Sequence, residues 1–190
     1  MFKSLWVVWF GLIVVLVAFS MSRVPLSPQT FTASFEFSSA RDAFEVLKTT
    51  TLMFKLQPFV DKINIVFVNE THRTVDFSEK IPILGNSTYI RTVTMRAEQQ
   101  FDSSRNEIIS MVPFPLKLGH LIANLTFVES TNISKNSANI QHGKKVAISC
   151  IEVLRGETWW IFKSFVESSV QEAHSKLISD IANYFNNTRS

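Results

Sequence analysis

The chain has 190 residues, of which 46% are hydrophobic and 18% are charged, and its formal net charge at pH 7 is +3. This composition supports one domain with a sizeable core and excludes an intrinsically disordered chain. The basic residues are scattered and form no stripe with interleaved aromatic residues, so we expect no nucleic-acid partner.

Two residue counts narrow the class of protein further. The single cysteine, Cys150, excludes an intrachain disulfide, so the fold must depend on its core. Phenylalanine occurs 17 times, which suits either a thick ordinary core or an apolar cavity.

The N-terminal segment is the most apolar part of the chain. From Leu5 to Phe19 it carries no charged residue, with Lys3 before it and Arg23 after it. Extended to Ser22, it has about eighteen residues, which is barely enough to span a bilayer core of about 30 Å. We therefore predict a transmembrane signal anchor from Leu5 to Ser22, with Lys3 on the cytoplasmic side.

A cleaved signal peptide is the alternative interpretation of residues 1–22. Ala18, Phe19 and Ser20 resemble the small-x-small pattern of a cleavage site. The body of the chain would then be secreted. Both interpretations place it in the lumen of the secretory pathway or outside the cell.

N-glycosylation motifs are in keeping with that location. Roughly two N-x-[ST] motifs are expected by chance at this composition. The chain has them at Asn69, Asn86, Asn124, Asn132 and Asn186, which we take as candidate glycosylation sites.

The segment after the anchor contains two prolines and several small polar residues. We predict that residues 23–30 form a linker and that residues 31–187 form the domain. Residues 31–37 alternate apolar and polar side chains, which predicts a half-buried strand.

Two short helices are predicted next. Ser39 is a suitable N-cap for a helix over residues 40–48. Residues 52–60 form a second apolar segment that we also predict to be helical, with Pro58 near its end.

Alternating apolar and polar residues then predict about six strands, joined by short turns. We expect them at residues 63–68, 73–83, 89–101, 107–112, 118–129 and 145–154. Consecutive strands with short turns form an antiparallel meander with one covered face.

The last stretch, from Glu157 to Asn187, has the period of one helix face. Its apolar residues recur in steps of three and four: Trp159, Phe162, Val166, Val170, Ala173, Leu177, Ile181 and Tyr184. About thirty residues give a helix of roughly 45 Å. A helix so long and so apolar on one side needs a large partner surface, which the sheet can supply.

This order of elements resembles the helix-grip fold of the START-like, or SRPBCC, superfamily. The resemblance is carried by FTASFEFSSARDAFEVL at residues 31–47, by TVDFSEKIPILGNSTYIRTVTMRAEQQFD at residues 74–102, and by the helix that follows LRGETWW. It implies an α+β fold in which a curved antiparallel sheet wraps around the long C-terminal helix, with two short helices after the first strand. It also implies that an apolar small molecule, often a lipid, binds in a cavity between sheet and helix.

The cavity residues that we predict come from both walls. The helix contributes Phe162, Val166, Ser169, Val170, Ala173 and Leu177, and the sheet contributes Arg91, Val93, Met95, Leu121, Ala123, Leu125 and Phe127. Close packing of helix on sheet, without a cavity, is the alternative.

Two polar residues near these walls allow two interpretations each. Arg91 shares the phase of Val93 and Met95, so it either anchors a ligand carboxylate or phosphate or extends into solvent. His174 borders the apolar helix face, so it either bonds a ligand or lies half in water. Of the carboxylates, alternation directs Asp76 and Glu98 toward solvent.

Positive signs of catalysis are absent from the sequence. There is no G-x-S-x-G motif, P-loop or Gly-rich dinucleotide turn, and the histidines have no metal-ligand spacing. We expect no metal and no cofactor, and we favour a membrane-tethered protein that binds, and in one version transfers, a lipid or other apolar small molecule. A cyclase-type or hydrolase-type enzyme using the same cavity, or an anchored interaction module without a cavity, are the alternatives.

Overall fold

The computed structural model describes residues 17, 20, 22–83, 86–130 and 146–188. Its elements are β1 (Arg23–Pro25), β2 (Gln29–Phe37), α2 (Ala40–Thr49), α3 (Leu52–Lys55), β3 (Val60–Val68), β4 (His72–Ile83), β5 (Asn86–Asp102), β6 (Glu107–Pro113), η1 (Pro115–Lys117), β7 (Gly119–Glu129), β8 (Val146–Trp159), η2 (Trp160–Phe162) and α4 (Lys163–Asn187). The predicted order of strand, two short helices, strands and long helix is confirmed.

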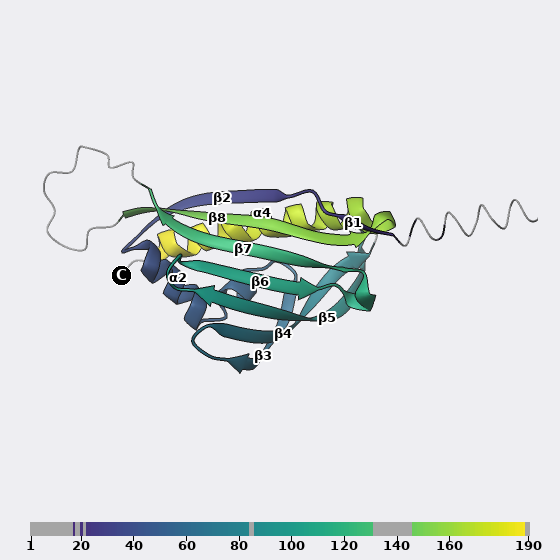
Figure 1. Cartoon of the computed structure of the whole chain (residues 1–190), viewed down its shortest axis with the longest axis horizontal. Coiled ribbons are helices and arrows are strands. Elements are labelled where there is room, and N and C mark those ends of the chain that lie inside the picture. The colour runs from purple at the N-terminus through teal and green to yellow at the C-terminus, as the bar shows by residue number, and fades with distance from the viewer. Residues whose placement is uncertain (1–16, 18–19, 21, 84–85, 131–145, 189–190) are drawn as a thin grey trace, which may run out of the picture.

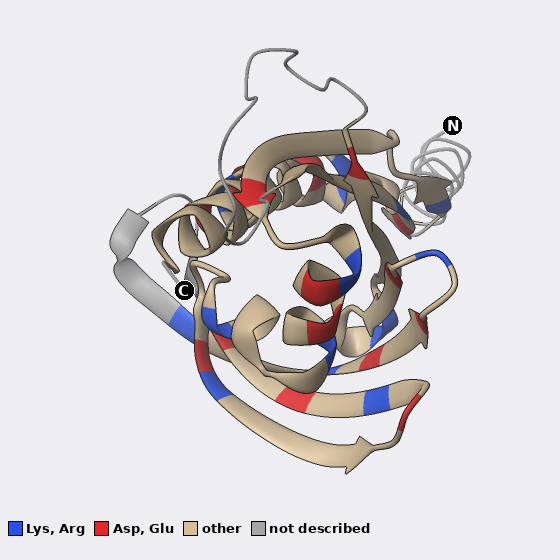
Figure 2. Ribbon diagram, turned by 90° about the vertical axis from the view of Figure 1, so that its left-hand side faces the viewer, with Lys and Arg blue, Asp and Glu red and all other residues tan. Residues whose placement is uncertain are grey.

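The strands form one eight-stranded sheet in the order β1-β8-β7-β6-β5-β4-β3, with β2 also paired to β8 (Figure 1). Every pairing is antiparallel. Seen end-on, the strands curve around α2 and α3, which lie on the concave side (Figure 2). The long helix α4 packs chiefly on β2 and β8.

Local sequence explains the first helix. The Ser39 hydroxyl accepts a hydrogen bond from the Asp42 backbone N–H at 3.0 Å, which confirms the predicted N-cap. Four buried residues then face the core: Ala40, Ala43, Phe44 and Leu47.

The second helix is shorter than predicted, because the chain is already extended at Val60, which pairs with Glu79. Pro58 disfavours helical backbone at the residue before it.

The largest part of the core lies between α2, the second half of α4 and the strands β2, β7 and β8. On α4 the buried residues are Leu177, Ile178, Ile181, Ala182 and Phe185. The Phe185 ring stacks on the Phe35 ring at a centroid distance of 4.7 Å. In contrast, Phe165 in the first half of α4 is 52% exposed. The helix is therefore held mainly by its C-terminal half.

The predicted helix start at Glu157 is wrong by six residues. Residues 157–159 belong to β8, where Glu157 pairs with both Pro25 and His120. Strand neighbours on both sides supply hydrogen bonds that outweigh the local helical period. Gly156 continues the strand because it lies against β7: a Cβ there would meet the His120 carbonyl oxygen at 2.3 Å.

The predicted linker at residues 23–30 is also wrong. Residues 23–25 form β1 on the edge of β8, and the buried Leu26 donates its N–H to the Gly156 carbonyl at 2.9 Å. Gln29 already begins β2. Pro25 is tolerated in β1 because an edge strand leaves one row of N–H groups outside the ladder, and Pro28 lies between β1 and β2. The folded domain thus begins directly after Ser22.

Within the described residues, no helix is both long and apolar enough to cross a membrane. Apart from residues 17, 20 and 22, the anchor predicted from Leu5 to Ser22 lies outside the described part of the chain. The anchor therefore stays a prediction.

Candidate functional site

The inner face of the sheet follows the predicted alternation. On β7 the four predicted inward residues, Leu121, Ala123, Leu125 and Phe127, are all buried. On β5, Val93 and Met95 are half-buried, and the same phase continues into the buried Ala97, Gln99 and Phe101. Arg91 is exposed, which matches the alternative that its side chain extends into solvent.

The predicted helix residues divide between two zones. Leu177 is fully buried in the main core together with Leu125 and Phe127. Four others, Val166, Ser169, Val170 and Ala173, are only half-buried. Phe162 precedes α4, and its ring stacks on Trp159. The concave interior is thus firmly packed around the second half of α4 and more open around the first half.

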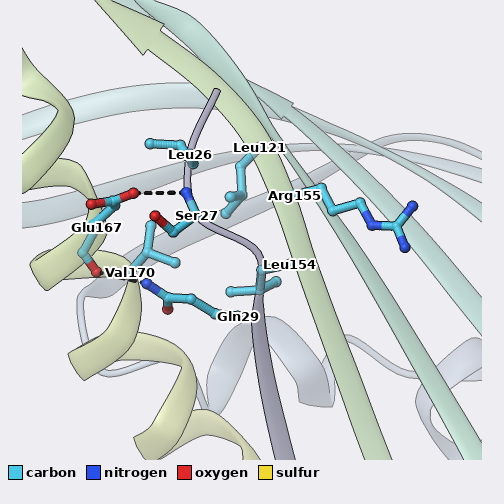
Figure 3. Close-up of a pocket in the computed structure, with 8 residues that line it drawn as sticks. All are labelled: Leu26, Ser27, Gln29, Leu121, Leu154, Arg155, Glu167 and Val170. Atoms are coloured by element: carbon cyan, nitrogen blue, oxygen red, sulfur yellow. Dashed lines mark hydrogen bonds between the residues drawn. The ribbon is translucent and has the colours of Figure 1, made fainter. Parts of the chain in front are cut away.

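A small pocket opens beside the first half of α4 (Figure 3). Its lining residues are Leu26, Ser27, Gln29, Leu121, Leu154, Arg155, Glu167 and Val170, of which Arg155 points away from the others. The Ser27 N–H donates to the Glu167 carboxylate at 2.7 Å, and the buried Gln29 Oε1 accepts no hydrogen bond from the described residues. The volume of about 10 Å³ has room for about one water molecule, so this pocket is too small for an apolar ligand.

Charged side chains also enter the interior at positions outside the predicted set of cavity residues. Glu152 of β8 is 1% exposed, and its Oε2 lies 2.9 Å from Nδ1 of His174 on α4. The Phe31 ring stacks on the imidazole at a centroid distance of 6.3 Å. Glu152 thereby holds the imidazole through Nδ1 and leaves Nε2 for another partner.

Glu79 of β4 interacts electrostatically with His174, and Glu79, Glu152 and His174 are together called the polar cluster. Glu79 shares the phase of the buried Val75 and Phe77, so it faces the concave side. Burial raises the pKa of the Glu79 carboxyl, and the charge of His174 opposes part of that rise. Within the described chain its carboxylate has neither a hydrogen bond nor an ion pair. Such a group is costly to bury and favours a proton, a cation or a ligand donor beside it.

The cluster has the parts for proton transfer. An imidazole oriented by a carboxylate serves as an acid or a base, and a carboxyl with a raised pKa serves as an acid. Sequence reasoning missed Glu152 and the importance of Glu79. The available signal was a charged residue in an apolar strand phase: Glu152 lies between Cys150 and Leu154 in one phase of β8.

A second buried polar group supports the fold. Arg73 of β4 donates to the carbonyls of Leu47, Lys48 and Thr50 at the end of α2, and its Nε donates to Gln99 at 2.8 Å. Burial lowers the pKa of Arg73 to about 10, so the side chain stays charged at neutral pH. Arg73 thus attaches α2 to the sheet through the helix C-terminus, where a cation is favoured.

The described residues form neither a metal site nor a reactive cysteine site. No group of three or more His, Cys, Asp or Glu side chains among them is arranged to hold a metal ion. Cys150 is buried, and burial raises the pKa of its thiol far above the usual value. Its thiol therefore stays protonated and is a poor nucleophile.

Comparison with known proteins gives a fold and no close relative. No family model and no curated protein matches the chain. Among solved structures, it is similar to Ara h 8.0201 (13% identity, TM-score 0.54, covering 84% of this chain and 98% of that one). It is also similar to the Zhui aromatase/cyclase from Streptomyces sp. R1128 (10% identity, TM-score 0.55, covering 83% and 93%).

A third similar structure is norcoclaurine synthase from Thalictrum flavum in complex with dopamine and hydroxybenzaldehyde (13% identity, TM-score 0.53, covering 92% of this chain and 94% of that one). At such low identity these similarities establish the fold alone. The protein has the helix-grip fold, in which a curved antiparallel sheet wraps around a long C-terminal helix, as the sequence predicts.

Proposed function

We propose that this protein is a membrane-tethered domain that binds a lipid or other apolar small molecule between the sheet and the first half of α4. One observation carries the proposal: Met95 on the sheet and Val170 on the helix remain half-buried, whereas the interior around the second half of α4 is packed. Because the pocket beside Val170 holds only about one water molecule, ligand binding requires the first half of α4 to move away from the sheet. Covering that surface with an apolar ligand is favourable by about 25 cal/mol per Å². The synthase of the same fold is in complex with dopamine and hydroxybenzaldehyde, which supports small-molecule binding by a protein of this fold.

Binding is tested by native mass spectrometry and organic extraction of the full chain expressed through a secretory pathway. A stoichiometric apolar molecule is the expected result. Ala173→Trp fills the space beside the half-buried helix face, so this variant should lose the bound molecule, as should Ser169→Phe.

The matched control is Ser175→Trp, because Ser175 is an exposed residue of the same helix. It should keep the ligand, and thermal unfolding should show that all three variants fold. If both Ala173→Trp and Ser169→Phe fold and retain the molecule, the ligand does not bind at this helix face.

The tether is tested separately. If residues 5–22 form a signal anchor, the protein stays in the membrane fraction after alkaline extraction. Treatment with an endoglycosidase should also lower the mass of the protein. This decrease should become smaller, step by step, as the five candidate asparagines are changed to glutamine. Release into the soluble fraction after cleavage near Ser20 would establish the secreted form instead.

The polar cluster favours a second candidate function, that of an enzyme using the same interior. His174, oriented by Glu152, would transfer a proton while Glu79 supplies or accepts another. His174→Gln should then abolish turnover of the extracted ligand but leave its binding intact. Turnover that persists in both His174→Gln and Glu79→Gln would contradict the enzyme hypothesis.

A further inference from the structure

Four large apolar side chains are exposed at one end of the molecule. Leu116 is 82% exposed, Phe165 is 52% exposed, and Trp160 and Ile161 are each 50% exposed. We call this set the apolar end. Exposed apolar residues gathered in this way on a soluble surface mark a contact with a partner or a membrane.

Backbone hydrogen bonds bring these residues together from distant parts of the chain. The Trp159 N–H donates to the Leu118 carbonyl at 3.1 Å, and the Trp160 N–H donates to the Ser22 carbonyl at 2.9 Å. Arg23 donates to the Lys117 carbonyl at 3.3 Å. Figure 1 shows β1, the connection between β6 and β7 and the start of α4 at the same end. The backbone segments that carry the apolar end therefore lie together at one end of the molecule.

Leu116 is held outward by a strained turn. Its φ is 56° and that of Lys117 is 58°, in the left-handed region that side chains with a Cβ disfavour. The Leu118 N–H closes the turn on the Pro115 carbonyl at 3.1 Å. Both the backbone strain and the exposure of the leucine side chain are unfavourable in water. They therefore favour a role for Leu116 in contacting a partner or a membrane.

The charges around the apolar end suit an anionic surface. Arg23, Lys117 and Lys163 lie among or beside its residues, and Glu157 and Glu167 pair with Arg23 and Lys163. Within the described chain Lys117 has no ion pair. The three cations exceed the two carboxylates by one, and Lys117 is available to a lipid headgroup.

The position of the apolar N-terminal stretch directly before the domain indicates that the partner of the apolar end is a membrane. The uncharged stretch from Leu5 to Phe19 ends three residues before Ser22, and Ser22 is hydrogen-bonded to Trp160. Since residues 23–30 belong to the fold, no linker separates the domain from that stretch. An anchor ending at Ser22 would therefore hold the apolar end next to the bilayer.

We infer that the apolar end docks on a lipid bilayer, with Leu116, Ile161 and Phe165 entering the interfacial region and Lys117 facing anionic headgroups. The inference rests on the tether in the proposed function but not on ligand binding. It orients the domain so that the open half of the interior, around Val166 and Val170, lies near the membrane.

The test measures depth in the bilayer with the full chain reconstituted in vesicles. Leu116→Cys carries an environment-sensitive fluorophore, since the buried Cys150 does not react in the folded protein. The control is Val128→Cys, which is 46% exposed near the other end of β7, about 30 Å along the strand. The vesicles contain phosphatidylcholine and phosphatidylserine with brominated acyl chains.

Quenching of the probe at position 116 should exceed that at position 128 several-fold, and Lys117→Glu should reduce it. Equal quenching at the two positions in a chain that floats with the vesicles would overturn the docking surface while leaving the tether intact. A chain that fails to float with these vesicles would overturn both. Ligand binding by that same chain would still support the cavity.

Discussion

Glu79 is a residue whose charge and surroundings conflict. It faces an apolar interior in the phase of Val75 and Phe77, and burial raises the pKa of its carboxyl. The folded state therefore holds a proton that the unfolded state releases between the ordinary pKa of 4.5 and the raised value. Stability falls as pH rises through that window and stays lower above it.

Glu79→Gln removes this ionisation, so we expect the variant to unfold at a higher temperature than the wild type at neutral pH. The difference should shrink as the pH falls below 4.5, where the carboxyl becomes protonated in both states. Thermal unfolding of both proteins at several pH values measures it. Glu98→Gln is the control because Glu98 is exposed on β5. A gain in unfolding temperature that is the same at every pH would contradict this account.

At the scale of the element, α4 combines a packed half with an open half. Phe185 is buried against Phe35 and Phe37, whereas Phe165, about five and a half turns earlier by helix geometry, is half-exposed. The amphipathic pattern of the helix runs along its whole length, so periodicity alone does not distinguish the two halves. What distinguishes them is that β2, β8 and α2 enclose the C-terminal half.

Phe185→Ala should lower the free energy of unfolding by about 3–5 kcal/mol, because it leaves a cavity in the core. Phe165→Ala, the same change at an exposed position of the same helix, should alter it by less than about 1 kcal/mol. Denaturant unfolding of the two variants compares them directly. Similar losses would mean that the first half of α4 is as tightly packed as the second.

At the scale of the whole molecule, residues 23–26 complete both the sheet and the core of the domain. β1 extends the edge of β8, and Leu26 fills a cluster with Leu121 and Leu154. The same residues connect the apolar end to the fold. The tertiary structure therefore assigns to the core a segment whose composition is typical of a linker.

A chain that starts at Phe31 should be less stable than one that starts at Ser22, by about 3 kcal/mol or more, since it lacks the buried Leu26 and the hydrogen bonds of β1. Denaturant unfolding of both chains gives the difference. The longer chain controls for removal of residues 1–21. Equal stability would restore the linker interpretation.

Much of the fold follows from local patterns. Alternation identified the inward face of β7, and Ser39 marked the start of α2, because which side of an element is apolar depends on its own residues. The candidate site is a different case. His174 and Glu152 lie on separate elements, and no spacing in the chain indicates that their side chains meet at 2.9 Å.

By itself, the sequence determined the order of the elements and their apolar faces, and the resemblance that they carry implied the helix-grip architecture. Only the tertiary structure decided that residues 157–159 extend β8, that residues 23–25 pair beside it and that Glu79 shares an interior with His174. The physical reason is that periodicity is a property of one segment. Strand pairing, the end of a helix and the burial of a charge depend instead on which distant segment lies beside it.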